Sequence, residues 1–437
     1  MPLQIIIVGA GISGLCTAVA LHRAGHFVKV FEKSLLAGEV GSAVLITPNG
    51  ERVLSRLGFD FARARADDMT YFEVMDGTTL QPLSFHNLED PRKEFGSPLY
   101  TVHRVDLLNE LLRLASGLDI RLRTKVTAAD ADQGFVDLED GTRHYADLIV
   151  AADGVHSFLR AVVMRDQVAA AVTHSGMSAF RFMIPTSMLQ DDQHFQKLLQ
   201  VKGKGSSLFA DTTRDTEHHM VWFTCRGKEL QTFVGIHESI QTCEDDLKTI
   251  MLKEFSHYHP SLTHVIKVAP VVTDWPLSIH DPLPIWHRGK VVLIGDAAHP
   301  MLPLGAQGAN QAIEDAGALG ALLGGVESAV QVPSRLALFE DVRRPRASRI
   351  QTLSNVRLGK EKDVEDKVRI YADPPGSDVP TTFRERYQHE YGYDVFAACK
   401  EVMFKEGAFD KLNNLLIHSN GVHANGGNHK LYRSFRG

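Results

Sequence analysis

The sequence predicts an α/β fold in which a doubly wound parallel sheet carries an inserted β-sheet domain and is followed by C-terminal helices. Three observations predict this fold. An apolar run near the amino terminus leads directly into a glycine-rich turn and a helical pattern. Two later apolar runs, far apart in the chain, each end on an aspartate that small residues follow. Between residues 166 and 270, strand–helix alternation gives way to short β-like runs.

Length and composition set the broad class of the protein. A chain of 437 residues exceeds the usual size of one hydrophobic core, which favours two domains. Hydrophobic residues make up 44% and charged residues 23%, as in an ordinary globular protein. A net charge of −6 offers no basic stripe for phosphates, so we expect neither a nucleic acid nor a membrane surface as partner.

The amino-terminal segment and the cysteines favour a cytoplasmic enzyme. The chain enters an apolar strand pattern at residue 3 without a basic segment or cleavage signal, which argues against a secretory signal peptide. No apolar stretch approaches the roughly 20 residues that a membrane-spanning helix needs. The four cysteines form no CxxC pair, so we expect reduced thiols rather than disulfides or a zinc site; they are Cys16, Cys225, Cys243 and Cys399.

The first element pair has the pattern of a Rossmann-like nucleotide site. The buried strand IIIV (5–8) is followed by the turn GAGISG (9–14), a helical pattern over 15–24 and a second strand over 27–31. Gly9 permits the tight turn, Gly11 lets the backbone approach a pyrophosphate, and Gly14 lets the helix pack against the strand. The helix N-terminus would then offer N–H groups to the phosphates.

Glu32 ends the second strand, at the spacing expected of a ribose ligand. Its carboxylate can accept hydrogen bonds from both ribose hydroxyls of an adenosine, and it would repel a 2′-phosphate. A glycine-rich turn without a ligand is the alternative, but the strand, helix and acid around the motif argue against it. These residues alone leave FAD and NAD equally open.

Two further strands end on aspartates. One strand pattern, over residues 146–152, is followed by DGVHSFLR, which begins with Asp153. The other, over residues 291–294, is followed by GDAAHPMLPLGAQGAN, which contains Asp296. Ligands of doubly wound sheets bind at the carboxyl ends of the strands. Carboxylates there suit an extended cofactor with a sugar-alcohol chain.

Together these three motifs resemble, in order and spacing, the fingerprints of the single-component (group A) FAD-dependent monooxygenases. That family has the p-hydroxybenzoate hydroxylase fold, of the GR2 type, and the resemblance covers most of residues 1–350. A closer resemblance, to fungal salicylate-hydroxylase-like enzymes, rests on four shorter stretches. They are EVGSA (39–43), TPN (47–49), VHRVDLL (102–108) and HEYGYD (389–394).

The resemblance implies tightly but non-covalently bound FAD, with a role for each matching residue. Arg104 would contact the pyrophosphate and ribityl region, Asp296 would bind a ribityl hydroxyl, and Asp153 would serve both FAD and transient NAD(P)H. Ala43 would approach the ring from the early loop, and the helix that starts near Gly308 would aim its N-terminus at the flavin. The full cofactor set is Gly9, Gly11, Ser13, Gly14, Glu32, Lys33, Ala43, Arg104, Asp153, Asp296, Gly308, Ala309 and Asn310.

The resemblance also suggests residues for catalysis and for substrate binding. Pro303 would border the flavin ring, and His299 lies in the same loop, where a structural hydrogen bond competes with proton transfer. Arg181 would orient a phenolate or carboxylate, with a solvated or internally paired arginine as the alternative. Trp222 and Phe223 are candidate walls of the substrate pocket, with packing in the protein core as the alternative for at least one of them. We expect no metal, because the neighbouring histidines 218 and 219 lack an HExxH-like companion.

The expected domains are discontinuous. Residues 1–75, 100–165 and 271–355 would form the FAD-binding domain, and residues 76–99 and 166–270 would form the substrate-binding β-sheet domain. Residues 356–437 would form a C-terminal helical region with a flexible tail. Within that region the helical patterns lie near 364–371 and 383–404, and the tail includes residues 420–428.

The chain has one dinucleotide fingerprint, which disfavours two-Rossmann monooxygenases and disulfide reductases, and it has no GWxWxIP-like segment of a halogenase.

The resemblance implies that NAD(P)H reduces FAD, that O2 forms a C4a-hydroperoxide, and that one oxygen atom enters an aromatic or phenolic small molecule. Rival outcomes are epoxidation, Baeyer–Villiger oxidation and indole oxidation; a flavoprotein acting only as a binding module is a further alternative. We expect a monomer or homodimer.

Overall fold

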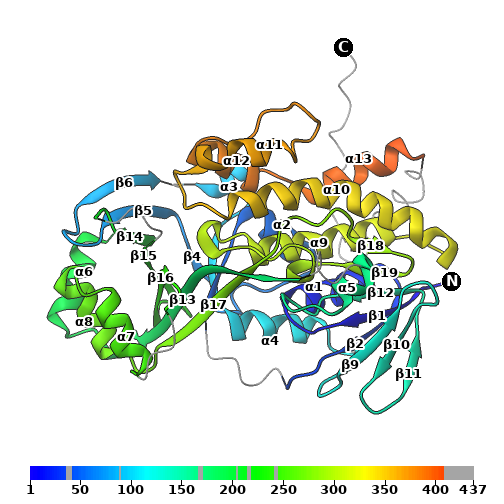
Figure 1. Ribbon diagram of the computed structural model, residues 1–437, viewed down its shortest axis with the longest axis horizontal. Coiled ribbons are helices and arrows are strands. Elements are labelled where there is room, and N and C mark those ends of the chain that lie inside the picture. The colour runs from blue at the N-terminus through cyan, green and yellow to red at the C-terminus, as the bar shows by residue number, and fades with distance from the viewer. Residues whose placement is uncertain are drawn as a thin grey trace, which may run out of the picture.

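The computed structural model describes residues 1–35, 42–87, 90–165, 171–202, 205–213, 218–240 and 245–407 (Figure 1). Two expectations fall outside these residues. They are the first three positions of the EVGSA stretch, 39–41, and the tail that includes 420–428.

A six-stranded sheet forms the centre of the nucleotide-binding half. Five of its strands run parallel, as expected of apolar runs such as IIIV that are buried on both faces, and the edge strand β18 is antiparallel. Ile5 lies opposite Val28 and Leu148. The strand order is β18(His287–Arg288), β19(Val291–Leu293), β12(Leu148–Ala151), β1(Gln4–Val8), β2(Phe27–Phe31) and β8(Asp119–Arg121).

Long helices cover this sheet. α1 packs against α9 so closely that a Cβ on Gly320 would lie 3.0 Å from the Cβ of Ala20. α9 in turn packs against α2, α10 and α13(Val395–Lys405), so it lies in the middle of the helical layer (Figure 1). The helices are α1(Ile12–Arg23), α2(Pro48–Arg56), α4(Arg104–Leu114), α5(Leu159–Met164), α9(Gly308–Leu323) and α10(Val332–Leu353).

A second sheet, of seven strands, forms the other half of the molecule. One face of it is covered by three helices, and a core of aromatic and aliphatic side chains fills the space between (Figure 1). The order is β17(Thr273–Ile279), β13(Thr173–Pro185), β16(Leu230–Glu238), β15(His219–Cys225), β14(Ser206–Ala210), β5(Tyr71–Asp76) and β6(Pro82–Asn87), and the helices are α6(Gln193–Val201), α7(Leu247–Glu254) and α8(Pro260–Val268). A parallel sheet with helices, joined to a mainly antiparallel sheet, confirms the predicted α/β fold class.

Two three-stranded sheets complete the β structure. The strand at residues 100–103 pairs in one of these small sheets, opposite residues 43–46. Their orders are β11(Arg143–Tyr145), β10(Phe135–Leu138), β9(Val126–Asp130) in one and β3(Ala43–Ile46), β7(Tyr100–His103), β4(Asp67–Asp68) in the other; the short helix α3(Pro91–Phe95) precedes β7.

The C-terminal region is helical but more broken than its sequence pattern predicts. The expected helix over 383–404 is two helices, because Gly392 ends the first and the Asp394 carboxylate caps the second by accepting the N–H of Phe396 at 2.9 Å. The expected helix over 364–371 is a short turn and a single helical turn. The helices are α11(Glu365–Arg369), α12(Phe383–Tyr391) and α13(Val395–Lys405).

Candidate active site

The glycine-rich turn lies at the carboxyl ends of β1 and β12. Gly9 has a φ of +107°, and a Cβ there would lie 2.2 Å from the carbonyl oxygen of Ala152. A Cβ on Gly14 would lie 1.9 Å from the carbonyl oxygen of Gly9. At Gly11, which precedes α1, a Cβ would meet no atom within 4 Å. The turn is therefore packed at Gly9 and Gly14 but open at the N-terminus of α1.

Glu32 closes this turn from the end of β2. Its buried carboxylate accepts the backbone N–H of Ala10 and that of Ser34, each at 2.7 Å. The next residue, Lys33, is exposed. Glu32 is thus held beside the glycine-rich turn, where sequence reasoning expects the adenosine ribose.

Ser13 connects the first motif to the third. A Cβ added to Gly295 would lie 2.8 Å from the Ser13 Oγ, so the two segments are in close contact. The Ser13 Oγ is buried and has no hydrogen-bond partner among the described residues. Because an unpartnered buried hydroxyl is costly, this atom is a ready donor for a bound group.

Arg160 joins the second motif to the third. Its buried guanidinium donates from Nε to the carbonyl of Ala297 at 2.8 Å, and from Nη2 to those of Val155 at 2.7 Å and Asp296 at 3.2 Å. Burial lowers the pKa of Arg160, an effect that the nearby carboxylates of Asp153 and Asp296 oppose. Sequence reasoning gave Arg160 no role, and its only signal was its place at the end of ADGVHSFLR.

Asp153 caps a helix. One oxygen of its carboxylate accepts the N–H groups of Phe158 at 3.1 Å and Leu159 at 3.3 Å, where α5 begins. Burial raises the pKa of Asp153, and hydrogen bonds from Ser157 and Leu159 oppose the rise. The cap explains why an acid stands here, while contact with FAD and NAD(P)H stays a prediction for this residue.

Arg104 is close enough to both Asp296 and Arg181 to interact with the charge of each. Burial lowers the pKa of Arg104, which the Asp296 carboxylate opposes. Burial also lowers the pKa of Arg181, and repulsion from Arg104 lowers it further. The structure thus gathers two predicted cofactor residues and the predicted substrate arginine in one charged group.

The loop before α9 is a tight turn that leads directly into the helix, as its small residues predict. Pro303 begins a short 3-10 turn, and Ala306 follows it with a left-handed φ of +53°. The helix then starts at Gly308, which is half-buried together with Ala309. Its N-terminus therefore follows the loop directly, as the prediction for the flavin ring requires.

Asn310 holds this loop to β3. Its side-chain oxygen accepts the N–H of Thr47 at 3.0 Å, and its amide donates to the carbonyls of Leu45 and Ala306, both at 2.9 Å. Ala43, half-buried, begins the same strand. The Asn310 side chain is thus occupied by the protein itself, so any part it plays in cofactor binding is to position the loop.

His299 is buried below the same loop. Its Nε2 lies 2.7 Å from the Asp315 carboxylate, whose other oxygen accepts from Arg343 Nε at 2.8 Å. The ring also lies 5.0 Å from the Trp286 ring, and the side chain is fully enclosed. These contacts favour the structural hydrogen bond over proton transfer.

The two faces of the seven-stranded sheet separate the predicted pocket residues. Trp222 is in the core under the helices, with its Nε1 donating to the Gln231 side chain at 2.8 Å. Arg181 lies on the other face, because it alternates with the core residues beside it on β13. The register, Arg181 opposite Val234 and Val234 opposite Val221, places half-buried Phe223 on the face of Arg181. The structure therefore brings Phe223, but not Trp222, to the side of Arg181.

That same face packs against the loop before α9. Ala179, two residues before Arg181, and Ile236 form a buried cluster with Leu302 and Leu304. The sheet face of Arg181 therefore adjoins the predicted flavin loop around Pro303.

A buried polar cluster, which sequence reasoning did not identify, supports the loop from behind. The Glu314 carboxylate accepts from Asn49 Nδ2 at 2.6 Å and Arg346 Nε at 2.8 Å, and it also pairs with Arg343. Arg346 further donates to the carbonyl of Glu390 at 2.9 Å. The TPN and HEYGYD stretches, far apart in sequence, thus meet at Glu314.

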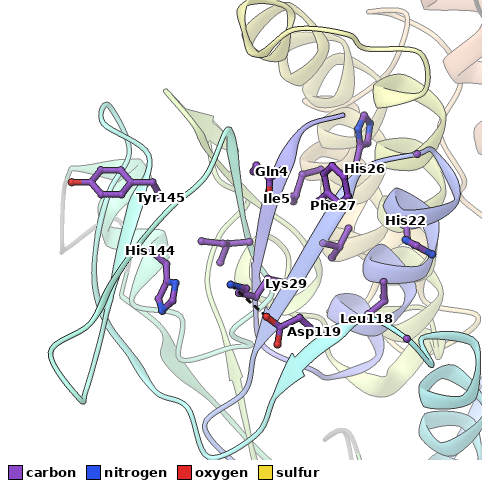
Figure 2. A pocket seen from close by; sticks show the side chains of 14 residues that line it. Gln4, Ile5, His22, His26, Phe27, Lys29, Leu118, Asp119, His144 and Tyr145 are labelled. Atoms are coloured by element: carbon purple, nitrogen blue, oxygen red, sulfur yellow. Dashed lines mark ion pairs between the residues drawn. The ribbon is translucent and has the colours of Figure 1, made fainter. Parts of the chain in front are cut away.

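A separate cavity of about 460 Å³ lies between the parallel sheet and the three-stranded sheet β11-β10-β9 (Figure 2). Its walls include Gln4 and Phe27, the first residues of their strands, and the ion pair of Lys29 with Asp119 at 3.4 Å. Because ligands of such sheets bind at the carboxyl ends of strands, this cavity at the amino ends is not the dinucleotide site.

The residues at the carboxyl ends fit an extended dinucleotide. The space at Gly11 admits a pyrophosphate, the Ser13 hydroxyl lacks a partner in the described residues, and Glu32 lies beside the turn. Asp296 is exposed between two buried neighbours, available to a ribityl hydroxyl. A fold and a site of this kind define a dinucleotide-binding protein.

Comparisons with known proteins identify the family. The FAD binding domain family matches residues 2–354, and the chain belongs to it. The FAD-dependent monooxygenase phomE′ of Diaporthe leptostromiformis is 34% identical over 391 residues, covering 86% of this chain and 96% of that protein. Hispidin-3-hydroxylase of Neonothopanus nambi is 32% identical over 371 residues, covering 79% and 86%. A salicylate hydroxylase, solved as a substrate complex, superposes with a TM-score of 0.70 at 25% identity, covering 91% of this chain and 97% of that one.

These findings confirm the predicted family, fold type and cofactor. The protein is a flavin-dependent monooxygenase of the p-hydroxybenzoate hydroxylase type, and it binds FAD. In the described ranges, no helix is both long and apolar enough to cross a membrane.

Proposed function

We propose that this enzyme consumes NAD(P)H and inserts one atom of O2 into an aromatic or phenolic small molecule, most simply by hydroxylation. Bound FAD supplies the redox and oxygen chemistry, and the chain binds and orients the reactants. Two of the relatives support this reaction, since they are a hispidin hydroxylase and a salicylate hydroxylase.

The observation that carries the proposal is the unbalanced charge of Arg181. Its described neighbours are the Trp275 ring, 5.6 Å from the guanidinium carbon, and the repelling Arg104; no carboxylate pairs with it in the described part of the chain. An incompletely hydrated cation without a counterion favours an anionic ligand. A phenolate or carboxylate next to the flavin loop satisfies that requirement, and a phenolate is also the more electron-rich form of a phenol.

We further propose a division of labour between the halves. Residues 1–75, 100–165 and 271–355 hold FAD, and residues 76–99 and 166–270 supply the substrate side. In the structure β5 and β17 extend the substrate-side sheet slightly past these boundaries, at 71–76 and 273–279. Pro303 borders the ring, Arg181 orients the substrate, and Phe223 contributes to the pocket wall.

Isotope labelling tests the reaction. Phenols and phenolic acids are screened for faster NADH or NADPH oxidation by the holoenzyme, and each stimulating compound is then incubated under ¹⁸O2. We expect one labelled oxygen atom in the product, as a new hydroxyl group. Accelerated NAD(P)H oxidation with no label in any product would contradict the proposal.

The same experiment separates the rival oxygenations. A labelled epoxide, ester or oxidised indole would identify epoxidation, Baeyer–Villiger oxidation or indole oxidation instead. A flavoprotein that serves only as a binding module would incorporate no label, and the monooxygenase relatives argue against it.

A further inference from the structure

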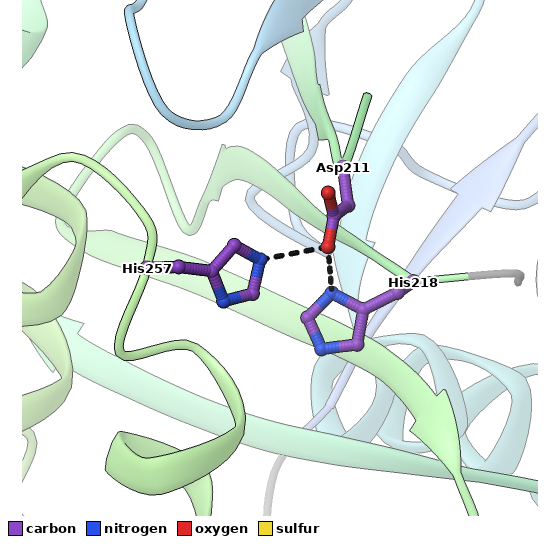
Figure 3. A group of neighbouring side chains, drawn as sticks. All are labelled: Asp211, His218 and His257. Carbon is purple, nitrogen blue, oxygen red and sulfur yellow. Dashed lines mark hydrogen bonds and ion pairs between the residues drawn. The ribbon is translucent and has the colours of Figure 1, made fainter. Parts of the chain in front are cut away.

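Three side chains from different parts of the substrate-side half converge on the helix-covered side of its sheet. Asp211 follows β14, His218 precedes β15, and His257 lies between α7 and α8. Figure 3 shows both imidazole rings directed at the carboxylate of Asp211. One ligand atom of each side chain lies within 4.8 Å of the other two.

From this juxtaposition we infer a binding site for one Zn²⁺ ion, held by Asp211, His218 and His257. The sequence predicted no metal, because histidines 218 and 219 have no nearby companion; the third ligand, His257, is brought in by the fold. Two imidazoles and one carboxylate form a ligand set that zinc takes in proteins, with water in the fourth position.

The distances suit this ion. The Asp211 Oδ2 lies 3.5 Å from His218 Nδ1 and 2.7 Å from His257 Nε2. Neighbouring ligands of a tetrahedral zinc ion are about 3.4 Å apart, given metal–ligand bonds of about 2.1 Å. The first pair already has this spacing, and the second needs to open by less than 1 Å. The His257 side chain can move, since it is 27% exposed, and it leaves a route for the ion.

Surrounding groups orient the two buried ligands. Thr213 donates its N–H at 2.8 Å and its hydroxyl at 2.6 Å to Asp211 Oδ1, which directs Oδ2 toward the histidines. Burial alone would raise the pKa of Asp211, but the hydrogen bonds outweigh it, so the pKa falls below its usual value. The His218 ring packs 4.4 Å from the Phe255 ring. Such outer contacts fix ligands in metal sites.

A simple hydrogen-bonded pair is the competing interpretation, and the structure contains examples of it. Asp192, Asp274, Asp315 and Glu340 each pair with one histidine. Asp211 differs because two imidazoles share a single oxygen. The pair of His264 with Asp192 is a close match for the His257 contact, since its distance is also 2.7 Å and its histidine is also 27% exposed. It provides the control.

Zinc titration of the untagged, chelator-treated holoenzyme tests the inference, with Zn²⁺ as the only added ligand. Calorimetry should show one Zn²⁺ per chain at micromolar protein, and zinc should raise the melting temperature. His257→Ala should weaken binding at least about tenfold, since even outer partners of metal ligands cost 10- to 100-fold. His264→Ala should bind as the unchanged protein does. Both variants should keep their circular dichroism and FAD absorbance.

Two results would overturn the site: no zinc binding by the unchanged protein, or equal binding by the His257→Ala and His264→Ala variants. If His257→Ala fails to fold, the visible absorption of Co²⁺ added to the unchanged protein tests the site instead. A four-coordinate site gives visible Co²⁺ bands at wavelengths longer than the FAD absorbance, and their absence rejects the site. Because zinc binding is measured without turnover, its failure leaves the proposed oxygenation untouched.

Discussion

At the scale of single residues, the site combines the Asp296 carboxylate with the guanidinium groups of Arg104 and Arg160. Arg104 also lies in electrostatic reach of Arg181. We predict separate tasks for these neighbours, with Asp296 serving the cofactor and Arg181 the substrate. Substitutions should therefore separate cofactor binding from turnover.

Asp296→Ala should weaken FAD binding. Loss of a charged hydrogen-bond acceptor costs about 1.5–3 kcal/mol, which corresponds to roughly 10- to 150-fold in the dissociation constant. FAD release during gel filtration, followed by the ratio of flavin to protein absorbance, measures the effect. Asp296→Asn, which keeps an acceptor oxygen, should retain more FAD. If the Asp296→Ala variant retains as much FAD as the unchanged enzyme, Asp296 does not bind the cofactor.

Arg181→Ala should impair turnover while FAD stays bound. Loss of a contact to an anionic substrate of about 1.5–3 kcal/mol lowers kcat/KM by roughly 10- to 150-fold. Arg143→Ala is the matched control, because that arginine is paired with Asp137 on the small sheet. Steady-state kinetics with the substrate found by screening measures both variants. An equal loss of kcat/KM in the two variants, or no loss in Arg181→Ala, would contradict the role of Arg181 in substrate binding.

The sequence alone could predict the positions of residues whose role depends on the local backbone conformation. Gly9 and Gly14 are examples, since a strand, a tight turn and a helix follow one another within the motif. It could not place Trp222 correctly relative to Arg181, because alternation defines two faces but not which face the helices cover. Nor could it show that His299 is enclosed by Asp315, whose partner Arg343 comes from another helix.

At the scale of elements, α9 is attached to α10 by buried charges. Burial alone would raise the pKa of Glu314, but the guanidinium groups of Arg346 and Arg343 outweigh it and lower the pKa to about 2. The stabilisation from the ionised carboxylate is complete above its ordinary pKa of 4.5 and is lost as the pH falls toward 2. The start of α9, and with it the flavin loop, depends on this attachment.

Glu314→Gln should destabilise the enzyme by about 3–5 kcal/mol at neutral pH, since it leaves buried Arg346 without a carboxylate and Arg343 with Asp315 alone. The difference from the unchanged protein should shrink between pH 4.5 and 2, because Glu314 then becomes neutral in the unchanged protein as well. Urea unfolding of both proteins between pH 7 and pH 2 measures this difference in the free energy of unfolding. Glu365→Gln, which breaks an exposed pair with Arg369, should change stability by less than about 1 kcal/mol. A pH-independent difference for Glu314→Gln would refute this account.

The elements themselves were predictable where periodicity is strong. The strands around Arg181 and the helix at Gly308 follow directly from alternation and from a glycine-rich start. The break between α12 and α13 was missed, because one apolar pattern runs through both helices and the cap at Asp394 depends on geometry. The long-range pairing of Asn49 with Glu314 leaves no local signal at all.

At the scale of the whole molecule, the C-terminal helices are part of the cofactor half. Arg346 donates to the carbonyls of His389 and Glu390, both at 2.9 Å. Arg386, fully buried on α12, lies so close to the flavin loop that a Cβ on Gly305 would be 2.1 Å from its Nη2. The family match ends at residue 354, yet the packing of the loop continues beyond it.

Truncation tests this dependence. A chain ending at residue 355 should lose FAD, or fail to accumulate in folded form, because the loop loses its support from α12. A chain ending at residue 407 keeps every contact described and should retain FAD. The two truncated chains are compared by their flavin absorbance after gel filtration, with circular dichroism as the folding control. Full FAD retention by the shorter chain would show that the loop is independent of the C-terminal helices.

Most of the seven-stranded sheet is inserted between two strands of the parallel sheet, while β5 and β6 come from the earlier segment 71–87. The chain leaves after α5 and returns through β17, and the strands on either side, β12 and β19, are neighbours that run parallel. Five of its seven strands, β13 to β17, therefore form one continuous stretch of chain that connects two adjacent strands of the parallel sheet. Such a stretch can be lengthened, reshaped or exchanged during evolution without moving the strand ends that hold the dinucleotide. One scaffold can in this way acquire new substrates while its oxidising chemistry stays the same.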